Sequence, residues 1–110
     1  MTVKELAEKL DAKILTGDTD REVKGVYTGD LLSWVISHAQ SDDAWVTVMN
    51  NINVLAVASL TDVACIIIAE DAEVEPDLLE RAEDREVCLI SSAKGSAEIV
   101  WQTAALLGIV

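Results

Sequence analysis

The apolar run Val63–Ala69 restricts the fold of this chain more than any other segment. It is rich in β-branched residues and contains no polar position, which predicts a strand with both faces buried. Strands of this kind belong to parallel sheets that carry helices on both faces. No apolar run in the chain is longer. Because about 20 residues are needed to span a bilayer, we expect no transmembrane segment.

Strand and helix patterns alternate regularly from residue 44 onward. The predicted strands are Ala44–Met49, Val63–Ala69 and Val87–Ile90. The predicted helices are Val54–Leu60, Pro76 to about Glu83, and Ser96–Leu107, the last with Ser96 as its cap and Gly108 as its stop. This β-α-β-α-β-α order predicts an α/β fold with a mainly parallel sheet, which is three-stranded over this part of the chain.

A helix and two short strands are expected before this unit. Thr2 and Glu5 have the spacing of a capping box, so the first helix should begin there and continue to Leu10. Asp30 is predicted to cap a second helix over residues 31–38. The two short strands are predicted at Ile14–Leu15 and Val23–Tyr27.

The length of 110 residues suits a single domain, residues 1–110, and 51% hydrophobic residues are typical of a folded chain. The formal net charge is −12. Nucleic acid requires a basic patch and an anionic membrane would repel such a chain, so neither is an expected partner. The N-terminus has no signal-like pattern, and Cys65 and Cys88 lie in apolar segments, as buried free thiols do. We therefore expect a cytoplasmic protein.

Polar residues follow the predicted parallel strands at their carboxyl ends, where open α/β sheets bind ligands. These candidate ligand-binding residues are Asn50, Asn51, Ser91, Ser92 and Lys94, with Gly29 and Asp30 expected nearby. Their amide, hydroxyl and ammonium groups offer hydrogen bonds to a small metabolite or a nucleotide. The alternative is that these residues only shape turns and cap helices, as polar loop residues commonly do.

The sequence shows no catalytic or metal-binding set. The phosphate-binding motif Gly-x-x-x-x-Gly-Lys-Ser/Thr is absent, and so is Gly-x-Gly-x-x-Gly. The single histidine, His38, and the two cysteines are too few for a histidine cluster or a Cys/His zinc site. We therefore expect no enzymatic activity, no catalytic residues, and neither a cofactor nor a metal.

Acidic residues concentrate in Glu70–Asp77 and at Asp42–Asp43. We expect both groups at the rim through which a ligand would enter. There they would repel an anion unless Lys94 and the helix N-termini offset their field. This arrangement favours a protein partner with a basic surface.

Apolar residues of the last predicted helix cover more than one narrow stripe, and tryptophan is enriched at protein interfaces. The candidates for a homodimer interface are therefore Trp34, Val100, Trp101 and Ala104. The alternative is that all three tryptophans, including Trp45, belong to the core of the monomer.

Several segments together resemble the DRTGG domain family. They are Glu22–Leu31, Trp45–Val48 with the turn Asn50–Asn53, Val54–Ala69, Glu75–Leu79, and Val87–Ser92 with the closing helix. The resemblance covers Lys4–Ile109. The family is similar in fold to the N-terminal domain of HPr kinase/phosphorylase and occurs beside CBS domains in some pyrophosphatases. Membership implies a regulatory or assembly module, without the separate phosphate-loop domain that carries the kinase activity of HPr kinase.

Two hypotheses follow from these observations. The leading one is a non-catalytic regulatory or assembly module that forms a homodimer. The alternative is a sensor that binds a small metabolite or a nucleotide at the carboxyl ends of the parallel strands. A kinase or hydrolase is disfavoured because the phosphate-binding motif is missing.

Overall fold

A single five-stranded sheet organises the structure, a computed structural model that describes residues 1–110. Its strands are β1 (Lys13–Thr16), β2 (Gly25–Thr28), β3 (Asp43–Thr47), β4 (Cys65–Ile68) and β5 (Leu89–Ser91). They lie in the order β1-β5-β4-β3-β2, and only β1 is antiparallel to its neighbour. The mainly parallel α/β fold is thus confirmed. The predicted three-stranded unit gains one short strand at each edge.

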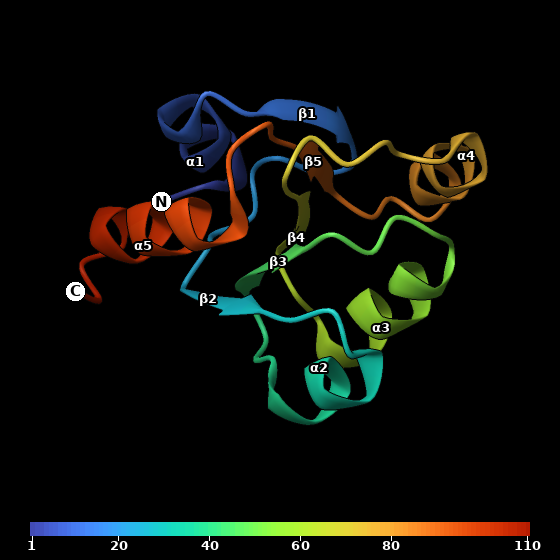
Figure 1. The fold of residues 1–110 in the computed structure, drawn as a ribbon, viewed down its shortest axis with the longest axis horizontal. Coiled ribbons are helices and arrows are strands. Elements are labelled where there is room, and N and C mark those ends of the chain that lie inside the picture. Colours follow the sequence, from blue (N-terminus) through green and yellow to red (C-terminus); the bar gives the residue numbers. More distant parts are fainter.

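Five helices cover the two faces of this sheet. They are α1 (Val3–Leu10), α2 (Leu32–His38), α3 (Asn53–Thr61), α4 (Pro76–Asp84) and α5 (Ser96–Leu106). Figure 1 shows α1 and α5 together on one side, with α2, α3 and α4 on the other. The result is a three-layer arrangement, in which β4 has a strand on either side and helices above and below. The longest helix, α5, has 11 residues, and no helix of the structure could span a bilayer.

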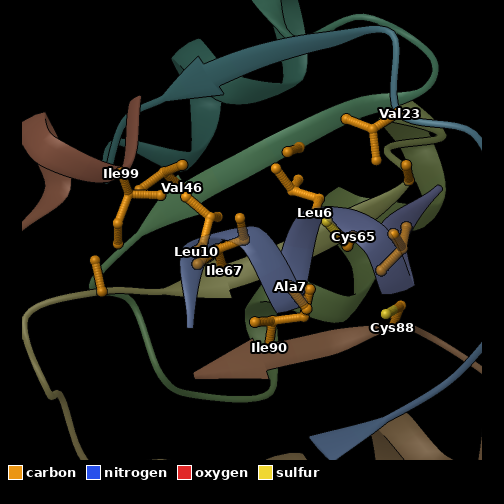
Figure 2. Close-up of a cluster of buried hydrophobic side chains, with 14 residues drawn as sticks. Leu6, Ala7, Leu10, Val23, Val46, Cys65, Ile67, Cys88, Ile90 and Ile99 are labelled. Atoms are coloured by element: carbon orange, nitrogen blue, oxygen red, sulfur yellow. The ribbon is translucent and has the colours of Figure 1, made fainter. Parts of the chain in front are cut away.

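The side chains of β4 alternate between two hydrophobic clusters. Cys65 and Ile67 pack in the cluster beneath α1 and α5, where Leu6 and Ile99 contribute from the helices (Figure 2). Ile66 and Ile68 pack in the other cluster, against α2, α3 and α4. All four β4 residues are at most 1% exposed. The prediction that Val63–Ala69 contains a strand buried on both faces is therefore confirmed.

The helix ends agree with the sequence at α1, at the start of α4, where Pro76 is the first helical residue, and at the end of α5, where Gly108 follows with a positive φ. The N-caps of α2 and α5 differ from the prediction. Thr2 caps α1 as predicted: its hydroxyl accepts a hydrogen bond from the Glu5 amide, and the Glu5 carboxylate accepts one from the Thr2 amide. The predictions that Asp30 caps α2 and that Ser96 caps α5 are wrong. The N-cap residues there are Leu31 and Gly95, and neither makes a side-chain cap bond.

The start of β5 lies against the turn that ends β1. Gly17 has a φ of +90°, and a Cβ at this position would collide with the backbone of Cys88 and Val87. The preceding residue, Thr16, donates a hydrogen bond from its hydroxyl to the Val87 carbonyl oxygen at 2.7 Å. Glycine at position 17 is therefore required both by the backbone conformation and by the close approach of the two strands.

Replacing Gly17 with alanine should lower the free energy of unfolding by about 3 kcal/mol or more, because the positive φ and the collision with Cys88 add together. Gly108→Ala is the matched control, since Gly108 has a φ of +76° and nothing lies within 4 Å of an added Cβ. In that variant the free energy of unfolding should fall by only about 1–2 kcal/mol, because the only cost is the strain of the positive φ. Urea denaturation measures both losses. Equal losses would contradict the close approach of the two strands.

Candidate functional site

The predicted ligand-binding residues gather at one edge of the sheet. Strands β2 to β5 are parallel, so their carboxyl ends lie at the same edge. Gly29 and Asp30 follow β2, and Asn50 and Asn51 follow β3. Ser91 ends β5, and Ser92 and Lys94 follow it. The structure therefore places all seven residues along a single rim, as the strand order requires.

Hydrogen bonds within the protein already occupy many polar groups of this rim. The Asp30 carboxylate accepts from the Thr47 hydroxyl at 2.7 Å and from the Val48 amide at 2.9 Å, which ties the end of β2 to the end of β3. The Asn50 side-chain amide donates to the Glu73 carbonyl oxygen. Asn51 accepts from the backbone amide of Asn53. These are the turn and loop roles that polar residues commonly have.

The first turn of α5 is covered by a carboxylate of the chain itself. Glu70 Oε2 accepts a hydrogen bond from the Ser96 amide at 2.9 Å, and the Glu70 amide donates to the Lys94 carbonyl oxygen. The Lys94 ammonium donates to Gln102 Oε1 at 3.1 Å, so it lies along α5. An anionic ligand at this helix N-terminus would have to displace Glu70, because both would bind the same free amides.

Two cavities open at the opposite edge, near the amino ends of β4 and β5. The first has a volume of about 300 Å³ and an apolar floor formed by Ala58, Val63, Ala64, Cys65, Val87 and Cys88. Its polar lining consists of Asp18, Arg21, Ser59, Asp62 and Glu86. The second cavity is lined by Gly17, Asp18, Glu83 and Glu86. Sequence reasoning missed this edge because its residues come from distant segments that share no motif.

The position predicted for Asp42–Asp43 is wrong. Asp43 begins β3 and Asp42 precedes it, so both lie at the amino edge, away from Glu70–Asp77. Asp42 Oδ1 accepts from both Nε and Nη2 of Arg21, at 3.0 and 2.8 Å. Arg21 Nη2 also lies 3.1 Å from Asp62 Oδ1. The segment before β2 is held to the starts of two central strands through this guanidinium.

These contacts lower the pKa values of both carboxyl groups, Asp42 and Asp62. Hydrogen bonds from Arg21 hold the pKa of Asp42 below its ordinary value. The pKa of Asp62 is lowered by a hydrogen bond from the Ser41 hydroxyl and by the charge of Arg21. The carboxyl group of Asp43 behaves in the opposite way, because burial raises its pKa.

Both cysteines are free and buried, as expected. Burial raises the pKa of the Cys88 thiol to about 11, and it raises the pKa of Cys65 further. A nucleophilic cysteine needs its thiolate form near neutral pH. The two thiols are therefore packing groups in the hydrophobic cluster beneath α1 and α5 (Figure 2).

The four residues predicted for a dimer interface differ in exposure. Trp34 on α2 and Trp101 on α5 are each 59% exposed, whereas Ala104 is buried at 7% and Val100 is half-buried. Trp45 is fully buried, and its indole N–H donates to the Gly29 carbonyl oxygen at 3.0 Å. The tryptophans thus divide between core and surface. Leu31, Ile36 and Leu60 are further exposed apolar side chains, on or beside α2 and α3.

The chain matches one protein family and is similar in fold to a solved structure. A family model described as the DRTGG domain matches residues 5–106, which agrees with the resemblance seen in the sequence. No curated protein sequence matches the chain. Among solved structures, the chain is similar to the CBS and DRTGG domains of the regulatory region of Clostridium perfringens pyrophosphatase, crystallised with its activator diadenosine tetraphosphate.

That similarity has a TM-score of 0.71 at 12% sequence identity, over 93% of this chain. The chain spans about half, 46%, of the solved regulatory-region chain. At this level of identity the likeness establishes a shared fold. It assigns no ligand to the residues described above.

Replacing Arg21 with methionine should lower the melting temperature at pH 7 by about 5 °C, because it removes the ion pairs with Asp42 and Asp62. Since the pKa of Asp42 is lowered in the folded state, this contribution is present above the ordinary aspartate pKa and is lost as the pH falls through the lower value. The difference between variant and wild type should therefore shrink between about pH 5 and pH 2. Melting curves across that range measure the effect.

Lys24→Met is the matched control for this experiment. It removes the same charge, but Lys24 is exposed and its Nζ lies 3.5 Å from Asp42 Oδ2. We expect a much smaller change in melting temperature from this variant. A loss in Arg21→Met that did not depend on pH would contradict the assigned role of the ion pair.

Proposed function

Because this chain belongs to the DRTGG domain family, we propose that it is a non-catalytic regulatory or assembly module of the cytoplasm that acts as a homodimer. The observation that carries the proposal is the exposure of Trp34 and Trp101, each 59% accessible. Tryptophan is large and apolar, and it is enriched among the residues that contribute most to binding energy at interfaces.

Both exposed tryptophans lie in stretches that carry no charged side chain. Residues 31–41 and residues 99–110 contain no Asp, Glu, Lys or Arg, in a chain with a net charge of −12. Leu31 and Ile36 are further exposed apolar side chains in the first stretch, and Leu106 and Ile109 are further ones in the second. Charges are depleted from interface cores in the same way.

The absence of carboxylates from these stretches favours a second copy of the chain as the partner. Two copies with net charge −12 repel each other wherever their acidic surfaces meet. In a two-fold dimer each patch meets itself, so an uncharged patch avoids that repulsion. A partner with a basic surface would instead favour Glu70–Asp77, where acidic side chains concentrate. That partner remains the alternative for assembly.

Light scattering after size-exclusion chromatography at about micromolar concentration should give twice the mass of the chain. Trp34→Gln or Trp101→Gln should raise the dissociation constant about 30-fold or more if that residue lies at the centre of the interface. Each variant serves as the control for the other, because α2 and α5 cover opposite faces of the sheet (Figure 1). A strictly monomeric wild type would overturn the dimer.

A second candidate function is a sensor of a nucleotide or another small metabolite. It is supported by the fold shared with the pyrophosphatase regulatory region, which was crystallised with the activator diadenosine tetraphosphate. The carboxyl edge of the sheet, with Asn50, Ser92 and Lys94, is the place that general fold rules favour for such a ligand. The Glu70 carboxylate at α5 opposes this second function, and any phosphate would have to compete with it.

Thermal-shift measurements with diadenosine tetraphosphate, ATP and acetyl phosphate test the sensor. A ligand at 100 times its dissociation constant stabilises the native state by about 2.7 kcal/mol, which would raise the melting temperature by several degrees. Lys94→Met should abolish the shift, whereas Lys9→Met, a charge removed from α1, should leave it unchanged. If none of the three compounds raises the melting temperature, the sensor is rejected.

A further inference from the structure

We propose that the 300 Å³ cavity at the amino edge of the sheet binds an alkylammonium group, supplied either by a free polyamine or by a lysine side chain of a partner protein. The cavity lies on the opposite edge from the residues that the sequence singled out. Its proposed role is independent of the dimer and of the sensor. The inference rests on three features: the apolar floor, the unpaired carboxylates, and the occupied guanidinium.

The floor of the cavity is made of small apolar groups. Ala58 comes from α3, Val63 and Ala64 from the segment entering β4, and Val87 and Cys88 from the segment entering β5. A volume of about 300 Å³ is at the small end of ligand pockets and suits a short alkyl chain. Both cysteine thiols are uncharged near neutral pH, because burial raises the pKa of each. They therefore add no negative charge to the cavity lining.

The charged groups at the mouth have a negative balance. Asp18 and Glu86 line both cavities and form no salt bridge, and Glu83 adds a third carboxylate at the second cavity. The one cationic side chain in the lining, Arg21, is already paired with Asp42 and Asp62. Asp18 Oδ1 accepts a hydrogen bond from the Asp20 amide at 2.9 Å, but no cationic side chain pairs with Asp18 or Glu86. An incoming cation therefore finds carboxylates without a cationic partner, whereas an anion finds no unpaired cationic side chain.

The geometry favours an organic cation over a metal ion. No group of three or more acidic, cysteine or histidine side chains converges closely enough to hold a metal. Hard divalent cations need six or more oxygen ligands close around them. An alkylammonium group differs because its methylene chain can bury apolar surface while its charged end stays at the wet rim. The apolar floor of the cavity would contact the methylene chain, and the carboxylates of Asp18 and Glu86 would contact the ammonium group.

Titration of ¹⁵N-labelled protein with 1,5-diaminopentane and with a short lysine-containing peptide tests the proposal. Both ligands should shift the amide resonances of residues 58–65 and 86–88. Tighter binding of the diamine identifies a free amine as the ligand, and tighter binding of the peptide identifies a partner's lysine. The double variant Asp18→Asn with Glu86→Gln should bind about tenfold more weakly.

The matched control is the double variant Glu73→Gln with Asp77→Asn. It changes the net charge by the same amount at exposed positions of the acidic loop and the start of α4, and it should bind like the wild type. A third variant, Ser59→Leu, narrows the cavity from an exposed position of α3 without changing any charge. This variant should abolish binding of both ligands. Equal weakening in both double variants, unchanged binding in Ser59→Leu, or no shift at residues 58–65 and 86–88 would overturn the proposal.

Discussion

Burial of β4 on both faces is the constraint on which the rest of the structure depends. Its four residues are almost completely inaccessible and alternate between two hydrophobic clusters. Covering both faces requires helices on both sides of the sheet, and parallel neighbours require those helices to serve as crossovers. Once α3 and α4 connect β4 to its neighbours, the carboxyl ends of four strands meet at one edge.

Internal polar contacts hold both edges of the sheet, but the two cavities open at the amino edge. At the carboxyl edge, Asp30 holds the ends of β2 and β3 together, and Glu70 covers the first turn of α5. At the amino edge the segments that enter β4 and β5 line a cavity. General rules for open α/β sheets favour the carboxyl edge for ligands. In this protein internal hydrogen bonds already occupy many polar groups of that edge.

The distribution of charge divides the surface into acidic and uncharged regions. Acidic side chains surround both edges of the sheet, whereas α2, α3 and the end of α5 carry none. The exposed tryptophans lie on this uncharged part. A strongly acidic chain stays soluble through repulsion, and only its uncharged surfaces allow close approach of a second copy. The exposed tryptophans that carry the proposed dimer and the carboxylates that carry the proposed cation site therefore lie on different segments of the chain.

Much of the fold could be predicted from the sequence, because its signals are local. The apolar run Val63–Ala69, the alternation of strands and helices after residue 44, and the Thr2–Glu5 capping box each depend on neighbouring residues. The resemblance to the DRTGG family rested on the same segments and agrees with the family match.

Only the tertiary structure decided how distant segments meet. In the structure β1 and β2 lie at the two edges of the sheet. Asp30 accepts a hydrogen bond from Thr47 instead of capping a helix, and Asp42–Asp43 lie at the amino edge. The tertiary structure also buried one tryptophan and exposed two, and it assembled a cavity from residues 18–21, 58–65 and 86–88. The physical reason is that helix and strand periodicity shows which face of an element is apolar. Which other element covers that face, and which polar groups then become neighbours, is determined by long-range packing.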